Sequence, residues 1–165
     1  MPFLTRLAVA EPFETWPGMK SAAEQRYWDG LILALGAPGT ETGAIYLLGY
    51  VAEMFLKTAY FQIIGVPNSH NIGSHLQGAR THASWRGGNL HNLRSWVVLL
   101  NNVRSIQGKP WNAVTAATIE RHVLTIDSHW RESLRYTSFA ATGAELDEVF
   151  ASVDWLRFNY DLLWR

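Results

Sequence analysis

The chain has 165 residues and a mass of 18.6 kDa, with 14 basic residues, 14 acidic residues and no cysteine. This length suits one domain with a substantial core. Apolar residues make up 48% and charged residues 17%, which excludes a disordered chain. The absence of cysteine excludes disulfides, thiolate nucleophiles and ordinary structural zinc sites. Because the net charge is +0, any contact with nucleic acid must come from a local cluster.

The N-terminal region predicts an arm without a helix. It has no basic segment followed by an apolar core and a cleavage site, so we read no signal peptide and expect a cytoplasmic protein. Three prolines lie in residues 1–20, and Pro38, Pro67 and Pro110 fall between periodic segments. Helices usually stop before such residues. We therefore predict an arm over 1–20 and a single helical domain over 21–165.

Periodicity predicts five helices. The first spans residues 21–35, where Ser21 and Glu24 have the spacing of a capping box. A glycine-rich turn leads into the apolar segment 43–66, and a polar, histidine-containing loop with room for a short helical turn follows. The remaining three predicted helices cover residues 90–106, 111–134 and 144–165. Alternation with period two is absent, so we predict an all-α fold, an antiparallel bundle of four to five helices.

The segment 43–66 is the most informative part of the chain. It is apolar almost all round, yet it carries Glu53 and Lys57 four residues apart, which places them on one helical face in the favourable order. Two ionisable groups at the middle of a bilayer would each cost about 2.5–3.5 kcal/mol, which argues against a membrane span. The helix therefore belongs in the centre of a bundle. Its charged pair either satisfies buried charge alone or also lines a ligand cleft.

The histidines do not have the spacing of a metal site. His70 and His75 are five residues apart in a loop, and His122 and His129 are seven apart on one helical face. Neither pair matches the i, i+4 or His-Glu-x-x-His arrangement of a helical zinc site. We predict no metal site and no cofactor.

The end of the fourth predicted helix carries a second polar group of interest. Arg131, Arg135 and Tyr136 lie close together there. Arginine offers a bidentate fork that suits a phosphate. Cations near a helix C-terminus are also favourable for the helix dipole alone. Both interpretations stay open from the sequence.

Several segments, taken in order, carry a family resemblance. They are GYVAEMFLKTAYF, HNIGSHL and HNLRSW, followed late in the chain by Trp130, Leu134, Arg135 and Tyr136. In this order the chain, over residues 22–164, resembles the HEPN superfamily, all-helical domains found beside nucleotidyltransferases and in toxin–antitoxin and anti-phage systems. The resemblance implies a bundle of four or five helices, usually a homodimer, with the functional cleft at the dimer interface.

Active members of that family are metal-independent endoribonucleases whose signature is an arginine followed four to six residues later by a histidine. The histidine serves as general acid or base, and the arginine stabilises the developing phosphorane charge. Here only Arg86 and His91 have this spacing, with glycine in place of the usual polar residue after the arginine. The spacing from Arg121 to His129 is too long, and Arg135 has no histidine after it. The ribonuclease signature is therefore degraded or absent.

The sequence thus favours a non-catalytic binding module: a HEPN-like dimer that binds a nucleotide, RNA or a partner protein, linked to a nucleotidyltransferase or to a toxin–antitoxin or defence system. The predicted ligand-binding residues are Glu53, Lys57, Arg131, Arg135 and Tyr136. The alternative is a metal-independent endoribonuclease toxin with a nonstandard Arg/His pair, and its candidate catalytic residues are Arg86, His91 and His129. A purely structural dimer is the third possibility.

Overall fold

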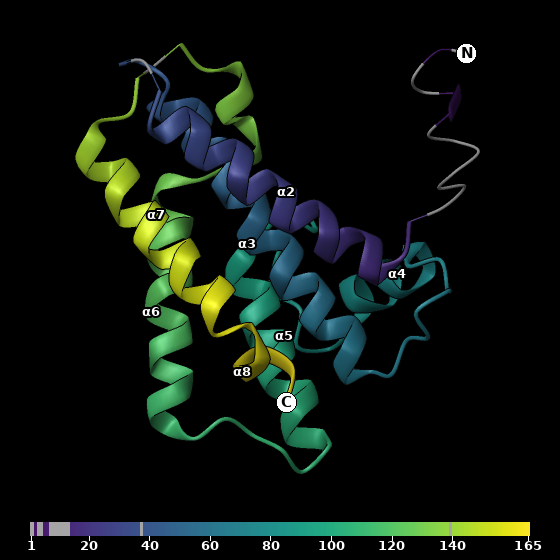
Figure 1. Cartoon of the computed structure of the whole chain (residues 1–165). Coiled ribbons are helices and arrows are strands. Elements are labelled where there is room, and N and C mark those ends of the chain that lie inside the picture. The colour runs from purple at the N-terminus through teal and green to yellow at the C-terminus, as the bar shows by residue number, and fades with distance from the viewer. Residues whose placement is uncertain (1, 3–4, 7–13, 37, 139) are drawn as a thin grey trace.

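The computed structural model describes residues 2, 5–6, 14–36, 38–138 and 140–165, and these contain helices and no strand. The all-helical fold predicted from the sequence is confirmed for this part of the chain, whereas the HEPN-like arrangement stays a prediction. The elements are α2 (Trp16–Ala34), α3 (Glu41–Ile63), α4 (Gly73–Thr81), α5 (Leu93–Ile106), α6 (Ala113–His129), the 3-10 helix η1 (Glu132–Tyr136), α7 (Gly143–Phe158) and α8 (Tyr160–Trp164) (Figure 1).

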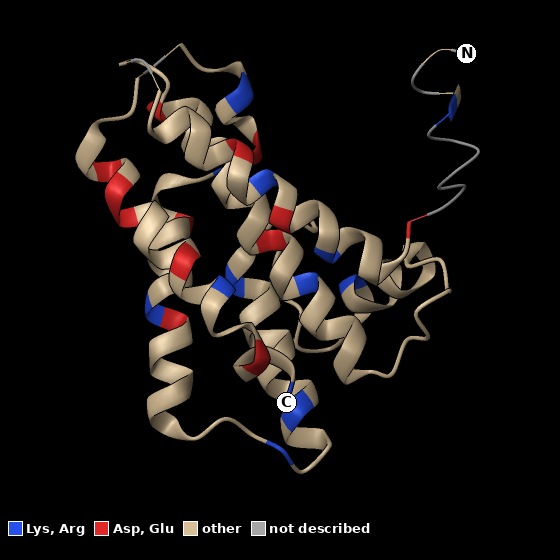
Figure 2. Cartoon of the chain, viewed as in Figure 1, with Lys and Arg blue, Asp and Glu red and all other residues tan. Residues whose placement is uncertain are grey.

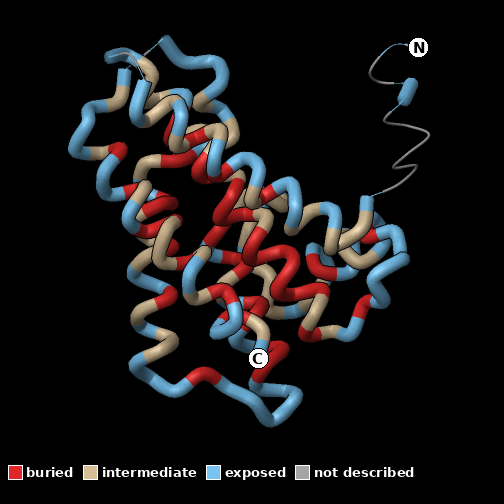
Figure 3. The backbone as a smooth tube through the Cα atoms, in the orientation of Figure 1, coloured by how far each residue is buried: buried red, intermediate tan, exposed pale blue. Residues whose placement is uncertain are grey.

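Helix α3 is the centre of the fold, as its composition predicts. Of its 23 residues, 15 are buried, including Glu53 and Lys57 (Figure 3). It packs against α2 on one side and against α5, α6, α7 and α8 on the other. Such burial on all sides explains why the segment has no polar face. None of the helices among the described residues is long and apolar enough to cross a membrane.

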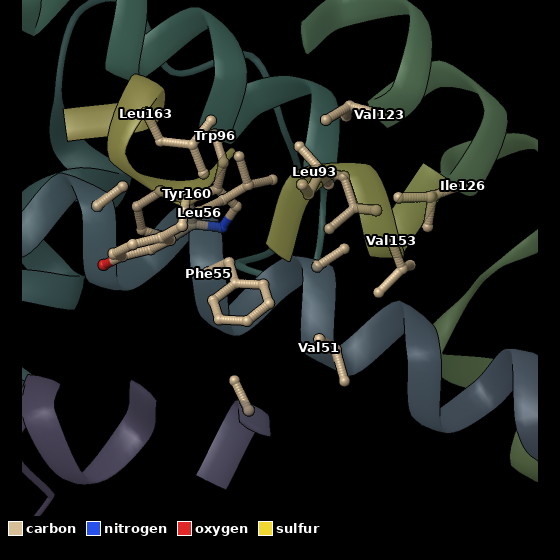
Figure 4. Packing of buried hydrophobic residues seen from close by; sticks show 14 of the residues in the cluster. Val51, Phe55, Leu56, Leu93, Trp96, Val123, Ile126, Val153, Tyr160 and Leu163 are labelled. Carbon is tan, nitrogen blue, oxygen red and sulfur yellow. The ribbon is translucent and has the colours of Figure 1, made fainter. Parts of the chain in front are cut away.

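The core is built around α3 from the apolar stripes of the helices packed on it, with Ala23 and Tyr27 contributed by α2. Figure 4 shows side chains of α3 meeting those of α5, α6, α7 and α8 above it. The residues labelled there are Val51, Phe55, Leu56, Leu93, Trp96, Val123, Ile126, Val153, Tyr160 and Leu163, and all are buried. This packing fixes the start of α5 and the second half of α6 relative to the middle of α3.

A glycine in α3 and a tryptophan after α6 lock these two helices together. A Cβ atom on Gly49 would lie 2.0 Å from the ring of Trp130, so only glycine leaves room for the indole. The indole N–H of Trp130 donates to the carbonyl oxygen of Tyr46 at 3.1 Å, and the side chain is 1% exposed. The segment that follows Trp130 is therefore anchored on α3.

The predicted end of the fourth helix was wrong for the same reason. Helix α6 ends at His129, not near Leu134, and Trp130 and Arg131 have extended backbone conformations before η1 begins. Burial of the Trp130 indole against α3 takes the chain out of the helical path. The last predicted helix is likewise divided, since α7 ends at Phe158 and α8 begins at Tyr160. The histidine-containing loop holds the short helix α4.

The predicted start of the first helix was also wrong. Helix α2 begins at Trp16, and the side chain of Thr15 accepts the backbone N–H of Gly18. Residues 16–20, predicted as part of the arm, therefore lie in α2, because proline is well suited to the first turn of a helix. The capping box occurs instead in α7, between Thr142 and Glu145. Residues 1, 3–4 and 7–13 of the predicted arm lie outside the described part of the chain.

The close approach of Gly49 and Trp130 predicts that a methyl group added at position 49 destabilises the fold. We expect Gly49→Ala to lower the free energy of unfolding by about 1–3 kcal/mol, the usual cost of overpacking. Gly78→Ala is the matched control within α4, because a Cβ atom there meets nothing within 4 Å. The control should be neutral or stabilising by about 0.4–1 kcal/mol. Urea denaturation of both variants measures this difference, and equal effects would contradict the packing described here.

Candidate functional site

The innermost group of the candidate site is a buried carboxylate, that of Glu53. Glu53 is 3% exposed in the middle of α3, and its carboxylate pairs with the ammonium group of Lys57 one turn further on. Its other oxygen lies 2.9 Å from Nδ1 of His91, which comes from the loop before α5. A buried carboxylate needs such partners, because an unpaired charge in the core is very costly. The predicted pair in α3 is thus joined by a residue 38 positions away.

The imidazole of His91 connects this buried pair to η1. Its Nε2 atom lies 3.4 Å from a carboxylate oxygen of Glu132, and Glu132 accepts a hydrogen bond from Arg135 at 3.1 Å. An imidazole donates from both nitrogens only when it is protonated. Basic and acidic side chains therefore alternate along a line from the core to the surface: Lys57, Glu53, His91, Glu132 and Arg135.

Two tyrosines of α3 form a wall beside this line. The rings of Tyr46 and Tyr50 contact each other edge to face at 5.0 Å, and the ring of Tyr50 lies edge-on to the imidazole of His91 at 6.2 Å. Burial raises the pKa of Tyr50 well above its usual range, and its hydrogen bond with Tyr46 and the nearby carboxylates raise it further. The Tyr50 phenol therefore stays neutral and does not serve as a base near neutral pH.

An open pocket of about 610 Å³ lies where His91 meets the end of α6. The loop before α5, the first turn of α5, the last turns of α6 and the start of η1 form its walls. Lining residues with polar side chains include Asn89, His91, Arg94, Asp127, Arg131 and Glu132. The N-terminus of α5 is also at this pocket, capped by Asn92, whose side chain accepts the backbone N–H of Ser95. A helix N-terminus favours negative charge.

One buried carboxylate holds two arginines at this pocket. Asp127 is 7% exposed, and its two oxygens lie 2.6 Å from Nε of Arg94 and 3.4 Å from Nη1 of Arg131. The two arginine side chains are 59% and 60% exposed. Each guanidinium has five N–H donors, so the ion pair with Asp127 leaves donors that can bind a ligand. We call Arg94, Arg131 and Asp127 the arginine clamp. Its chemistry suits a phosphate or a carboxylate.

The structure brings together most of the predicted ligand-binding residues. Glu53 and Lys57 lie behind His91, Arg135 is linked to it through Glu132, and Arg131 lines the pocket.

The side chain of Tyr136 is 78% exposed and does not line the pocket. The guanidinium of Arg135 lies 4.7 Å from the centre of its ring, which is a cation–π contact at the surface. Tyr136 therefore contacts Arg135 at the surface, and its predicted role in ligand binding stays a prediction.

The other candidate catalytic residues lie apart from His91. The guanidinium of Arg86 donates to the carbonyl oxygens of Ala83 and Trp85, and none of its interactions among the described residues involves His91. His129 pairs with Glu148 at 3.1 Å on the other side of the α6 end. In space, the arginines that share a pocket with His91 are those of the clamp, not the one at the signature spacing.

Sequence reasoning missed Arg94, Asp127 and Glu132. Asp127 had a detectable signal, because it is an acid next to the apolar stripe of α6, where it follows the buried Ile126. An acid in such a position needs a cationic partner. Arg94, however, is 33 residues away, and no local spacing indicates that it supplies this partner.

Comparison of the chain with protein-family models, with curated proteins and with solved structures found no match. Within the described ranges, no group of three or more metal-binding side chains that could hold an ion was found. The function must therefore be argued from the pocket itself.

The buried pair allows a direct test of the charge argument. Lys57→Met removes one partner of a buried carboxylate and should lower the free energy of unfolding by about 3–5 kcal/mol. The double variant Glu53→Leu/Lys57→Met removes both charges and should cost less than the single change. Arg26→Met breaks an exposed pair with Asp29 and should cost at most about 1 kcal/mol. Denaturant titrations compare these variants with the single variant Glu53→Leu; a double variant as unstable as the sum of Glu53→Leu and Lys57→Met would contradict the pairing.

Proposed function

We propose that this protein is a HEPN-like helical module that binds a phosphate-bearing ligand, a nucleotide or RNA, without catalysing a reaction. The binding site is the pocket between His91 and the arginine clamp. The family resemblance extends the proposal to a cytoplasmic homodimer that works with a nucleotidyltransferase or within a toxin–antitoxin or defence system. The all-helical fold is compatible with that resemblance.

The observation that carries this proposal is the arginine clamp. Asp127 is buried, yet its carboxylate orients the guanidinium groups of two arginines whose side chains remain more than half exposed. Two arginines fixed by one carboxylate lose less conformational freedom on binding an anion than two free ones. His91 lines the same pocket, and both of its ring nitrogens face carboxylates, those of Glu53 and Glu132. Because the net charge of the chain is +0, any contact with nucleic acid must come from a local cluster of this kind.

The clamp predicts which arginines matter for binding. Arg94→Ala and Arg131→Ala should each weaken binding of a fluorescent RNA oligonucleotide by about 10–100-fold, the value of a charge-assisted hydrogen bond to phosphate. Arg80→Ala, an exposed arginine in the last turn of α4 that lines none of the pockets described, is the control and should bind normally. Fluorescence anisotropy at low salt measures all four proteins. Equal losses in the control, or failure of the unaltered protein to bind either the oligonucleotide or a mononucleotide such as AMP, would refute the proposal.

A second function is favoured by one specific observation. A carboxylate oxygen of Glu53 lies 2.9 Å from Nδ1 of His91. The other ring nitrogen, Nε2, is therefore directed toward the pocket that Arg94 and Arg131 also line. A carboxylate that orients a histidine is the arrangement of a general acid or base, and an arginine can stabilise phosphorane charge. This geometry supports the alternative of a metal-independent endoribonuclease with a nonstandard Arg/His pair.

RNA cleavage distinguishes the two functions. We expect no cleavage when the purified protein is incubated with mixed RNA and a chelator, because Glu132 faces Nε2 of His91 and occupies its outward side. Robust cleavage that is lost in His91→Ala and kept in His129→Ala would instead establish the ribonuclease. His129 is the matched control, since it is also a histidine paired with a glutamate.

A further inference from the structure

A second, smaller cavity of about 350 Å³ adjoins the pocket of the arginine clamp. Arg131 and Ser133 line both cavities, so the segment between α6 and η1 is their common wall. The other walls of the smaller cavity come from the start of α3, the last turn of α6 and the region that leads into α7. Nothing in the function proposed above uses this cavity.

The charged groups of the smaller cavity already have partners, and for Arg131 this partner is Asp127. His129 pairs with Glu148 at 3.1 Å. The carboxylate of Glu145 accepts the backbone N–H and the hydroxyl of Thr142 at 2.7 and 2.8 Å. These hydrogen bonds hold the pKa of Glu145 below its usual range. The cavity therefore offers no unpaired charge of its own to a ligand.

The remaining lining is apolar with a few hydroxyl groups. Ile45, Leu134 and Ala141 supply the apolar part, and Ser128 and Ser133 supply hydroxyls. Such a lining suits an uncharged group with an apolar face and hydrogen-bonding edges. The volume lies at the lower end of the roughly 300–1,000 Å³ found for small-molecule sites, so the group must be compact.

We propose that the two cavities are two subsites for one ligand, a nucleoside monophosphate. The phosphate lies on Arg94 and Arg131, and the nucleoside lies against Ile45 and Leu134 in the smaller cavity. This inference rests on the proposed phosphate binding and narrows the ligand to a single nucleotide. Arg131 is the contact shared by both subsites, which explains why it is held by Asp127 yet remains exposed.

Isothermal titration calorimetry on the full chain tests this inference with three probes: inorganic phosphate, ribose 5-phosphate and AMP. We expect AMP to bind at least about 10-fold more tightly than either of the others, because only AMP fills the apolar part of the second cavity. Ser128→Phe places a ring at the rim of that cavity and should abolish the advantage of AMP while leaving phosphate binding unchanged. Ser105→Phe is the matched control, since Ser105 is also an exposed helical serine bonded to the preceding turn.

The outcomes separate the two proposals. If neither phosphate nor AMP binding depends on Arg94 and Arg131, the proposed function fails. If binding depends on these arginines but AMP gains nothing over phosphate, or keeps its advantage in Ser128→Phe, the second subsite is refuted and the clamp stands. An RNA oligonucleotide that binds more tightly than AMP also refutes the single-nucleotide ligand. If Ser128→Phe unfolds, Ala141→Phe fills the same cavity from its other side and carries the test.

Discussion

The burial of one carboxylate, that of Glu53, is the constraint on which the rest of the site depends. A charge at 3% exposure in the central helix must be paired, and Lys57 alone satisfies only one of its oxygens. His91 pairs with the other, which fixes the loop before α5 on the surface of α3. Through Glu132 the same imidazole also positions the start of η1. The pocket wall is therefore set by electrostatics in the core together with the packing of α5 on α3.

Packing of Trp130 determines the opposite wall. The indole fills the space left by Gly49, and the chain leaves the helical conformation there. If α6 continued to residue 134, Arg131 and Arg135 would stand one turn apart on one helical face. Arg131 still pairs with Asp127, four residues earlier, as it could in a continuous helix, while after the break Glu132 faces His91. The break in the helix thus separates two basic residues that look equivalent in the sequence.

Features that depend on residues close in the sequence could be predicted, whereas features that depend on contacts between distant residues could not. The central helix and the Glu53–Lys57 pair follow from spacing alone. The exit of Trp130 from α6 depends on Gly49, 81 positions earlier, and periodicity continues across it without a signal. Arg94 and Asp127 meet for the same reason, through the packing of α5 on α6. Half of the candidate site was therefore visible in the sequence, and the clamp that gives it a chemistry was not.

The distribution of charge also bears on the size of the anion that the proposed site would bind. Basic and acidic residues are interspersed along the helices of the described chain (Figure 2). At the pocket itself, Asp127 and Glu132 stand between the basic groups. A polynucleotide gains affinity by placing successive phosphates on a continuous basic track, and the described lining of this pocket interrupts its arginines with Asp127 and Glu132. A single phosphate group, in contrast, needs only the donors of Arg94 and Arg131. The charge pattern therefore favours a small phosphate ester over a long RNA at this pocket.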